Sequence, residues 1–475
     1  MSNNAWPKIK NIAGSVNSGK VSAVSNVKKS LEQIKKSSEY QAIISVVEDR
    51  ALQRAAEIDV MVASGQNAGR LAGVPFIAKD NFLTFGSETT AASNILKGFN
   101  APYQSTAIEK LEAEGAICVA KANLDAFAHG GSTENSDFFV TKNPHDVTKV
   151  PGGSSGGSAA SVVLGMAPFA LGTDTGGSIR LPASFCGAVG YKPTYGLVSR
   201  FGVVAMASST DTIGPLTNNV EDAALVLDCM AGVDRRDGTT IAKDENGYLP
   251  VDDETLPKQK IGIIKEYMGD GLDGDVRSAI TSAVEKLKKS GHEITQVSLP
   301  SLPLALASYY VIVPAEISSN LARYDGQRFG YSVDDAKNLE ESYNQSRSQG
   351  FGAEAKRRIM IGTYVLSSGY YDAYYKKAQT LRTQLINEFT DAFKNVDFLI
   401  GPVAPETAFK IGENSDDPLK MYLVDIMTVA VSLAGLPSVS VPITVTGMPV
   451  GLQIIGAQKS DKKLLQMAKS AEGVI

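Results

Sequence analysis

Histidine and cysteine are both scarce in this chain, which has 475 residues and only three of each. Cys118, Cys186 and Cys229 lie far apart and form no C-x-x-C pair. This spacing argues against a disulfide framework and a cysteine-ligated zinc site, and it is typical of proteins from a reducing cytosol. The first ten residues are polar and lack the apolar core of a signal peptide. We therefore expect a cytoplasmic protein.

The three histidines provide no familiar catalytic arrangement. His145 lies in a polar turn and His292 in a helix-ending turn, so we expect both to be exposed. His129 stands next to two glycines and is predicted to lie in a loop or at a rim, with a ligand or a base as the alternative. None of the three belongs to a nucleophile elbow, which disfavours a Ser-His-Asp triad. No H-E-x-x-H motif or cluster of metal ligands occurs, so no metal site is expected.

Positive charge and long hydrophobic runs are also in short supply. Acidic residues outnumber basic ones by 51 to 46, and the net charge is −5. Nucleic-acid-binding domains are usually basic, so if RNA is involved we expect a partner to bind it. The longest uncharged stretch, 426–458, contains three prolines and predicts buried strands and turns rather than a membrane span.

Predicted strands and helices alternate along the whole chain. Strands are predicted at 73–79, 117–121, 169–172, 261–264, 294–297, 398–402 and 439–445, and helices at about 20–65, 106–114, 158–164, 275–289 and 335–395. The alternation predicts an α/β fold with a mixed, mostly buried sheet covered by helices on both faces. We expect a single large domain over residues 1–475, with an N-terminal helical segment (1–65), a core (70–220) and a helical Tyr-rich segment (335–395).

One segment, Gly14-Ser-Val-Asn-Ser-Gly-Lys-Val21, nearly matches a phosphate-binding loop. Val21 replaces the hydroxyl residue that would hold magnesium, and no apolar strand precedes the segment. We interpret it as a turn that opens the first helix.

Two glycine- and serine-rich loops stand out instead. One runs from Val150 to Ser158 (VPGGSSGGS) and the other from Gly172 to Arg180 (GTDTGGSIR). Alone, such loops are more often turns or phosphate cradles than catalytic sites. A nucleophilic serine needs a base, and glycines beside it let backbone N–H groups converge on a developing oxyanion. The run Thr175-Gly-Gly-Ser178 has the composition for such an arrangement.

Lys79 ends a predicted buried strand. A lysine in that place is desolvated, which lowers its pKa and lets it act as a neutral base. The alternative is an ordinary strand-end lysine that reaches solvent or pairs with an acid, and spacing alone favours this second interpretation.

The residues from about 73 to 220 resemble the amidase signature family. The resemblance rests on the two loops together with Gly73-Val-Pro-Phe-Ile-Ala-Lys-Asp80. It implies that Lys79 is the base, that Ser154 is a bridging serine at a cis peptide, and that Ser178 is the nucleophile.

The same resemblance assigns roles to the residues around the nucleophile. It implies an oxyanion hole formed by the N–H groups of Thr175, Gly176, Gly177 and Ser178. Asp174 and Arg180 match the family as well, and we interpret both as groups that fix the loop.

Over residues 20–470 the chain is most similar to the A subunits of glutamyl-tRNA(Gln) and aspartyl-tRNA(Asn) amidotransferases. The motifs that carry this similarity are Asn123-Leu-Asp, Gly131-Ser-Thr-Glu-Asn, Pro193-Thr-Tyr-Gly, Lys356-Arg-Arg-Ile-Met and Gly369-Tyr-Tyr-Asp-Ala-Tyr-Tyr. In that family glutamine donates the ammonia. Tyr309, Arg358 and Asp425 match the positions that bind it, since arginine forks onto a carboxylate and aspartate pairs with an ammonium.

The resemblance therefore implies that the chain is the glutaminase component of a larger enzyme. Ammonia would pass to a B subunit that binds Glu-tRNA(Gln) or Asp-tRNA(Asn) and uses ATP and magnesium, and a small C subunit would complete a heterotrimer. No cofactor is expected in this chain. The alternatives are a stand-alone amidase for another small amide and a catalytically silent binding subunit.

Three positions depart from the family pattern. The usual Asp-Glu-Phe-Ala-Met is Asp-Ala126-Phe-Ala-His129 here, and Ser432 stands where asparagine is common. The implied triad is intact, and the changes at Ala126 and His129 lie near the substrate loop that the resemblance implies.

Overall fold

The computed structural model describes residues 6–249, 251, 256–415 and 417–475. Within them, eleven strands form one sheet in the order β1-β3-β2-β4-β6-β5-β10-β11-β9-β7-β8. The strands are Ile43–Val46 (β1), Pro75–Lys79 (β2), Ile117–Ala122 (β3), Phe169–Asp174 (β4), Val189–Lys192 (β5), Thr212–Thr217 (β6), Lys260–Ile264 (β7), Glu293–Val297 (β8), Phe398–Pro402 (β9), Ser438–Ile443 (β10) and Val450–Gly456 (β11). Strand β2 is parallel to β3 and β4, whereas β4 and β6 are antiparallel, so the predicted mixed sheet is confirmed.

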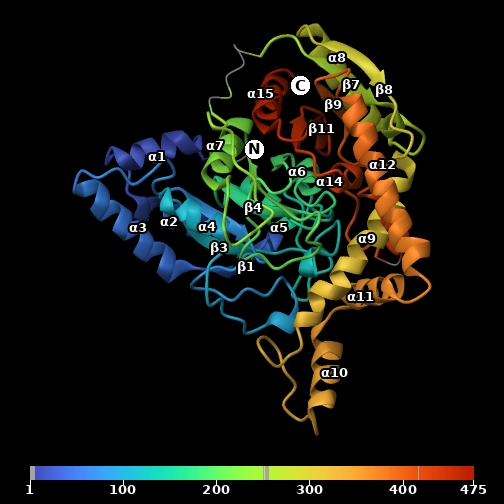
Figure 1. The fold of residues 1–475 in the computed structure, drawn as a ribbon. Helices are drawn as coiled ribbons and strands as arrows, with labels where there is room; N and C mark the ends of the chain where they lie inside the picture. Colours follow the sequence, from blue (N-terminus) through green and yellow to red (C-terminus); the bar gives the residue numbers. More distant parts are fainter. Residues whose placement is uncertain (1–5, 250, 252–255, 416) are drawn as a thin grey trace.

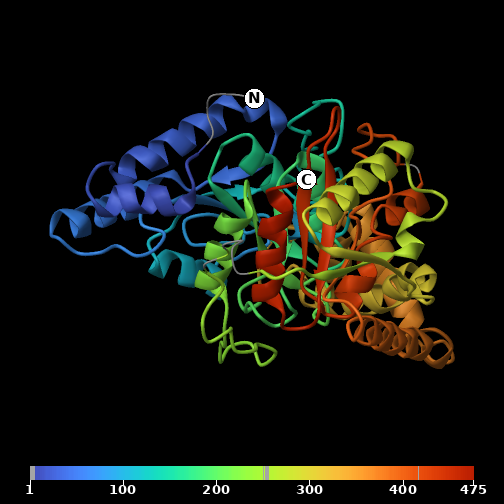
Figure 2. The ribbon, with the colours of Figure 1, turned by 90° about the horizontal axis from the view of Figure 1, so that it is seen from above.

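Helices surround this sheet (Figure 1). They are Ile9–Asn17 (α1), Ala23–Lys36 (α2), Glu48–Ala63 (α3), Thr106–Ala113 (α4), Gly156–Val163 (α5), Arg180–Cys186 (α6), Val220–Met230 (α7), Gly274–Lys289 (α8), Ala305–Asn320 (α9), Leu339–Gly350 (α10), Ala353–Leu366 (α11), Lys377–Ala392 (α12), Pro418–Leu423 (α13), Val429–Leu433 (α14) and Asp461–Glu472 (α15). The N-terminal helices, blue in Figure 2, lie at one end of the molecule, and the yellow and orange helices lie at the other.

Both faces of the sheet are covered, as two adjacent residues of β5 show. Neighbouring side chains on a strand point to opposite faces. A methyl group at Gly190 would lie 2.6 Å from Ala183 Cβ of α6. The hydroxyl of Tyr191 instead donates to Asp461 Oδ1 of α15 at 3.0 Å. Helices α6 and α15 therefore pack on opposite faces, as the hydrophobic pattern predicts.

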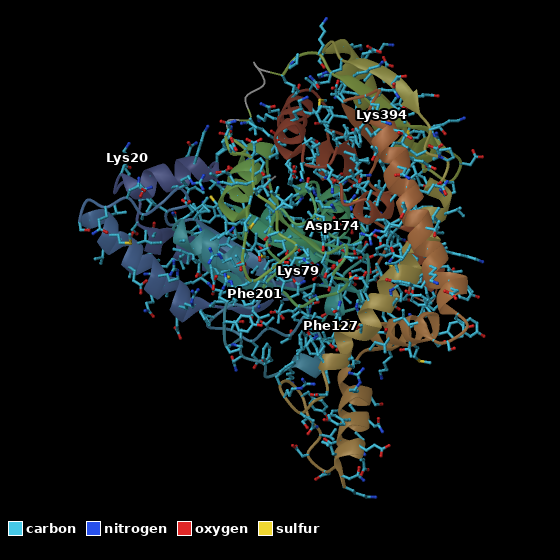
Figure 3. The ribbon with its side chains drawn as sticks, in the orientation of Figure 1. Lys20, Lys79, Phe127, Asp174, Phe201 and Lys394 are labelled. Carbon is cyan, nitrogen blue, oxygen red and sulfur yellow. The ribbon has the colours of Figure 1, made fainter. Side chains whose placement is uncertain are left out.

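The topology brings Lys79 and the second glycine-rich loop to one edge of the sheet. Strands β2 and β4 are parallel neighbours that end at Lys79 and Asp174. The carboxyl ends of parallel neighbours meet at the same edge, so the lysine and the loop after Asp174 lie together. Figure 3 shows Lys79 and Asp174 near the centre of the molecule.

The N-terminal region differs from the prediction in one element. Residues Ile43–Val46 lie within the predicted helical stretch but form β1, which pairs with β3 in the antiparallel direction. Two isoleucines and a valine in four residues favour an extended strand, and the neighbouring strand supplies the hydrogen bonds. Pairing with β3 at the edge of the sheet makes this segment a strand, and that pairing depends on the tertiary fold.

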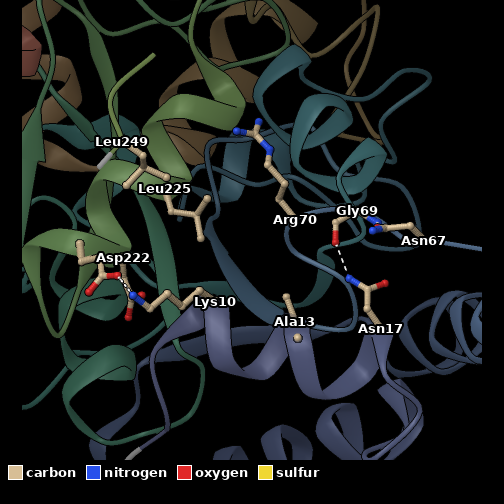
Figure 4. A pocket seen from close by; sticks show the side chains of 11 residues that line it. Lys10, Ala13, Asn17, Asn67, Gly69, Arg70, Asp222, Leu225 and Leu249 are labelled. Atoms are coloured by element: carbon tan, nitrogen blue, oxygen red, sulfur yellow. Dashed lines mark hydrogen bonds and ion pairs between the residues drawn. The ribbon is translucent and has the colours of Figure 1, made fainter. Parts of the chain in front are cut away.

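The segment that nearly matches a phosphate-binding loop does not open the first helix. Gly14 lies inside α1, and the remainder forms the end of α1 and the turn before α2. Gly14 and Asn17 line a cavity of about 370 Å³ (Figure 4), in which Asn17 donates to the carbonyl of Gly69 at 2.9 Å. The segment is thus a helix end rather than a nucleotide site.

One helical stretch, Leu302–Arg323, is long and apolar enough to cross a membrane by length and composition. Half of its most apolar window is buried inside this fold, where α9 packs against α11 and α12. Core helices of globular proteins meet the same criterion, and we interpret this one as a core helix.

Candidate functional site

Lys79 lies at the centre of a buried cluster of hydroxyl groups. Its side chain is fully buried, and its Nζ donates to Ser154 Oγ at 2.7 Å, Ser155 Oγ at 2.9 Å and Thr173 Oγ1 at 3.0 Å. Burial lowers the pKa of Lys79 to about 7, against the opposing effect of nearby carboxylates. A substantial fraction of this amine is therefore neutral near pH 7, as a general base must be.

Ser155 and Thr173 are site residues that the sequence interpretation missed. The hydroxyl of Ser155 also donates to the carbonyl of Thr173 at 3.2 Å, which joins the two loops beneath Lys79. The sequence does contain a signal for both, because Ser155 follows Ser154 directly and Thr173 comes near the end of a strand beside Lys79. The peptide bond between Gly153 and Ser154 is cis, as the family resemblance implies.

Ser178 approaches this cluster from the second loop. The N–H of Ser155 donates to the carbonyl of Ser178 at 3.2 Å, so the two loops touch at their serines. Across the described part of the chain, the hydroxyl of Ser178 forms no hydrogen bond, and the N–H groups of Gly176, Gly177 and Ser178 have no protein acceptor. The side chain of Thr175 is held in place because its hydroxyl donates to Asp211 Oδ1 at 2.7 Å. A hydroxyl beside converging free donors is the arrangement required for an oxyanion hole.

A buried ion pair holds the loop that carries Ser178. Asp174 and Arg180 are both fully buried and pair at 2.9 Å, and Asp174 also accepts from the N–H of Ile179 at 3.1 Å. Arg180 donates to Ser432 Oγ at 2.8 Å, and Ser432 donates to Asp174 at 3.2 Å. Ser432, one of the departures from the family, therefore bridges this ion pair rather than contacting the hydroxyl cluster.

Tyr309 and Asp425 lie against the glycines of the same loop. A methyl group at Gly176 would lie 2.6 Å from Tyr309 Oη, and one at Gly177 would lie 3.2 Å from Asp425 Oδ1. Burial raises the pKa of Asp425 to about 7, although Arg358 opposes the shift. Among the described residues its carboxylate accepts no hydrogen bond, so its oxygens are open to a ligand.

Arg358 sits on α11 at the other side of the site. Its guanidinium lies 5.3 Å from the ring centre of Tyr310 and 5.5 Å from that of Tyr422, and its Nε pairs with Glu354 at 2.8 Å. In the residues described, its two terminal nitrogens form no hydrogen bond. Arg358 and Glu354 line a cavity of about 260 Å³ that also reaches Asp125. A rigid, buried guanidinium with two free nitrogens is suited to a carboxylate.

One histidine prediction is wrong. His292 is buried rather than exposed, and its Nδ1 accepts from the N–H of Gln259 at 3.1 Å. His129 lies in a loop, as predicted, but it is fully buried, and neither ring nitrogen has a hydrogen-bond partner in the described residues. Burial lowers the pKa of His129 well below its usual range, so the ring is neutral. It lines the cavity of Arg358 and forms no hydrogen bond with Lys79 or the loop serines.

Comparison with known proteins gives one consistent family. A sequence model of the family described as Amidase matches residues 25–465. The second A subunit of glutamyl-tRNA(Gln) amidotransferase in Clostridium acetobutylicum is 52% identical over 450 residues, covering 94% of each chain. The crystal structure of the A subunit of this amidotransferase from Thermotoga maritima has a TM-score of 0.77 and 40% identity, covering 94% of this chain and 90% of that one. The peptide amidase of Stenotrophomonas maltophilia has a TM-score of 0.83 and 29% identity, covering 99% and 97%.

Proposed function

This chain belongs to the amidase family, where it stands with the A subunits of glutamyl-tRNA(Gln) amidotransferases, and we propose that it hydrolyses glutamine through an acyl-enzyme on Ser178. The observation that carries the proposal is the fully buried Lys79, which donates to Ser154 at 2.7 Å beside the free N–H groups of Gly176 to Ser178. Base, bridging hydroxyl, nucleophile and oxyanion donors thus lie at one edge of the sheet.

The proposed reaction moves one proton back and forth through the cluster. Neutral Lys79 takes the proton of Ser178 through Ser154, and Ser178 Oγ attacks the side-chain amide carbon of glutamine. The N–H groups of Gly176 to Ser178 bind the oxygen that becomes negative. Lys79 returns the proton to the departing nitrogen, and ammonia leaves. Water activated by the same lysine then hydrolyses the ester and releases glutamate.

The charges around the site support a free amino acid as the substrate. Arg358 offers two free nitrogens to the α-carboxylate, and Asp425 offers a free carboxylate to the α-ammonium. Tyr309 lies beside the same loop with its hydroxyl toward Gly176. A stand-alone amidase for uncharged amides has no use for both of these charges, so we favour glutamine over another small amide.

The relatives are named as A subunits, so the amidotransferase has more than one kind of chain. We further propose that the ammonia passes to a B subunit that binds the tRNA, ATP and magnesium, and that a C subunit completes a heterotrimer. The acidic net charge of −5 supports this division, because the chain itself is poorly suited to holding tRNA.

Covalent labelling tests the proposal directly. A fluorophosphonate mimics the tetrahedral intermediate and is expected to modify Ser178 in the folded chain, with prior incubation with glutamine slowing the reaction. Peptide mapping identifies the labelled residue. Absence of the label from Ser178, in protein shown to be folded by its cooperative thermal transition, contradicts the amidase function.

The dependence of hydrolysis on pH should separate the two groups that titrate near pH 7. Lys79 works only when neutral and Asp425 binds an ammonium only when ionised, and each has a pKa of about 7, so both require higher pH. In the free enzyme both must lose a proton, so log kcat/KM should fall with a slope approaching two below pH 7. Bound ammonium keeps Asp425 ionised, so log kcat should fall with a slope of one. Equal slopes for the two parameters would contradict these assignments.

Replacement of Arg358 by lysine is expected to raise the KM for glutamine about tenfold or more with little change in kcat. Lysine keeps the charge but loses the planar fork that binds both carboxylate oxygens, a loss of about 1.4 kcal/mol or more. Arg357→Lys is the matched control, since Arg357 is the neighbouring residue and lines the same cavity, but its side chain is exposed and pairs with Glu354. Its KM should stay within about twofold of the wild type. An equal effect of both substitutions would count against Arg358 as the carboxylate ligand.

A further inference from the structure

Asp125 is a fully buried acid that the proposed mechanism does not use. Its Oδ2 accepts from the N–H of Thr133 at 2.9 Å, and its Oδ1 accepts from the N–H of Asn135 at 3.1 Å. The carboxylate packs directly against Gly153, where a methyl group would overlap Oδ2. The N–H of Asp125 donates to the carbonyl of Ser154 at 3.3 Å. This residue therefore contacts Gly153 with its side chain and the carbonyl of Ser154 with its backbone N–H.

Thr133, which Asp125 fixes, holds the same loop at two further points. Its hydroxyl donates to the carbonyl of Gly152 at 2.8 Å and accepts from the N–H of Gly156 at 3.1 Å. Gly152 and Gly156 flank Ser154 on either side in the sequence. The loop is thus held before, at and after the serine that bonds to Lys79.

We propose that Asp125 is a positioning residue of the catalytic cluster, which holds the Ser154 hydroxyl at Lys79 through its contacts with Gly153, the Ser154 carbonyl and Thr133. The inference rests on the proposed function, because it assigns Asp125 a role in that reaction. It goes beyond the family resemblance, in which Asp125 belongs to the motif Asn123-Leu-Asp and has no assigned role.

The charge of Asp125 gives this role a measurable signature. Three carboxylates act on Lys79, and Asp125 has the largest effect among them, followed by Asp174 and Asp211; all three raise the pKa of the lysine against its burial. Asp174 is paired with a buried arginine, and Asp211 accepts from a threonine and two backbone N–H groups. Asp125 has no cation as a hydrogen-bonding partner in the described residues, and the acids that interact with it are Glu134 and Asp425. Removal of this charge should lower the pKa of Lys79 further.

Asp125→Asn is the main test, because it removes the charge and replaces one acceptor oxygen with an amide that cannot accept an N–H. We expect the rate constant for fluorophosphonate labelling of Ser178 in the full chain to fall about tenfold to a hundredfold at pH 8. The labelling rate constant falls at acid pH, and the midpoint of this fall should also move to lower pH by about half a unit or more. A merely structural role would lower the rate or the stability without moving the midpoint.

Asp222→Asn is the matched control. Asp222 is also buried, accepts from the N–H of Ile9 at 2.9 Å, and has a pKa raised by burial to about 6, as has Asp125. It lies at the start of α7, where it bonds to the first residue of α1, and it is not among the carboxylates that act on Lys79. Its variant should label Ser178 at the wild-type rate with the wild-type midpoint.

A second variant, Asp125→Ser, and the wild type complete the test of the positioning role. The Asp125→Ser variant has a smaller side chain but loses the same charge, so the midpoint of its labelling rate against pH should shift in the same way. An unchanged midpoint in both variants overturns the proposal, and so does failure of both to fold while Asp222→Asn folds, since Asp125 would then be structural. If the wild type itself leaves Ser178 unlabelled, the proposed function fails and the role of Asp125 fails with it. Labelled wild type with unaffected Asp125 variants removes the positioning role alone.

Discussion

Ser178→Ala is expected to lower glutamine hydrolysis by a factor of about a thousand or more while leaving amidation from free ammonium near the wild-type rate. Alanine removes the oxygen that forms the acyl-enzyme, and no residual binding or oxyanion stabilisation replaces a missing nucleophile. The amidation step itself belongs to a partner chain under the proposed division of labour. Glutamate release measures the first reaction, and formation of amidated tRNA with added ammonium chloride measures the second.

The structure predicts that this substitution leaves the fold intact. The hydroxyl of Ser178 forms no hydrogen bond within the described chain, so its removal orphans no buried partner. Ser161→Ala is a suitable control, since Ser161 lies buried on α5, donates to the carbonyl of Ser158 at 2.8 Å and does not contact Lys79. It should keep both activities. Loss of the ammonium-dependent reaction in Ser178→Ala to the same degree as the glutamine-dependent one would show that the two reactions are not separated between chains.

Local sequence signals identify much of the catalytic edge but not its geometry. The two loops and the strand ending at Lys79 are visible as apolar runs followed by glycines and serines. Spacing alone leaves Lys79 an ordinary strand-end lysine, because its three hydroxyl partners come from positions 75 to 94 residues later. The pairing of β2 with β4 brings Thr173 beside Lys79, and the loop before α5 adds Ser154 and Ser155. The family resemblance supplies that information in place of the local sequence.

The residues around the substrate cavity are even harder to identify from the sequence. Arg358 and Asp425 are 67 residues apart in the sequence, and neither one, taken alone, differs from an ordinary charged residue. His129 is predicted at a loop or rim, yet Phe127, Tyr324 and Phe351 form an aromatic cluster that encloses this region. Burial of this kind depends on contacts between the loop of His129 and residues far later in the chain. It leaves no periodic pattern in the sequence.

The second large effect is expected at Lys79. Lys79→Met retains a long unbranched side chain but removes the base, and we expect glutamine hydrolysis to fall about a thousandfold or more. Lys79→Arg should be equally inactive although it keeps the charge, because arginine does not become neutral in proteins. Activity in Lys79→Arg but not in Lys79→Met would show that the charge matters and the proton transfer does not.

Lys192→Met separates the loss of a base from the loss of any buried lysine. Lys192 is also fully buried with a pKa lowered by burial to about 7, but it donates to the carbonyl of Leu436 at 2.6 Å and lies apart from the serines. Its variant should keep the activity per folded molecule.

Between pH 7 and the usual lysine range near 10.5, the unfolded state holds a proton that buried Lys79 has lost, so the stability of the fold rises with pH across this window. Removal of the amine abolishes this penalty near pH 7. This gain offsets the loss of the three hydrogen bonds from Nζ, so the Tm of Lys79→Met near pH 7 is expected to stay close to that of the wild type.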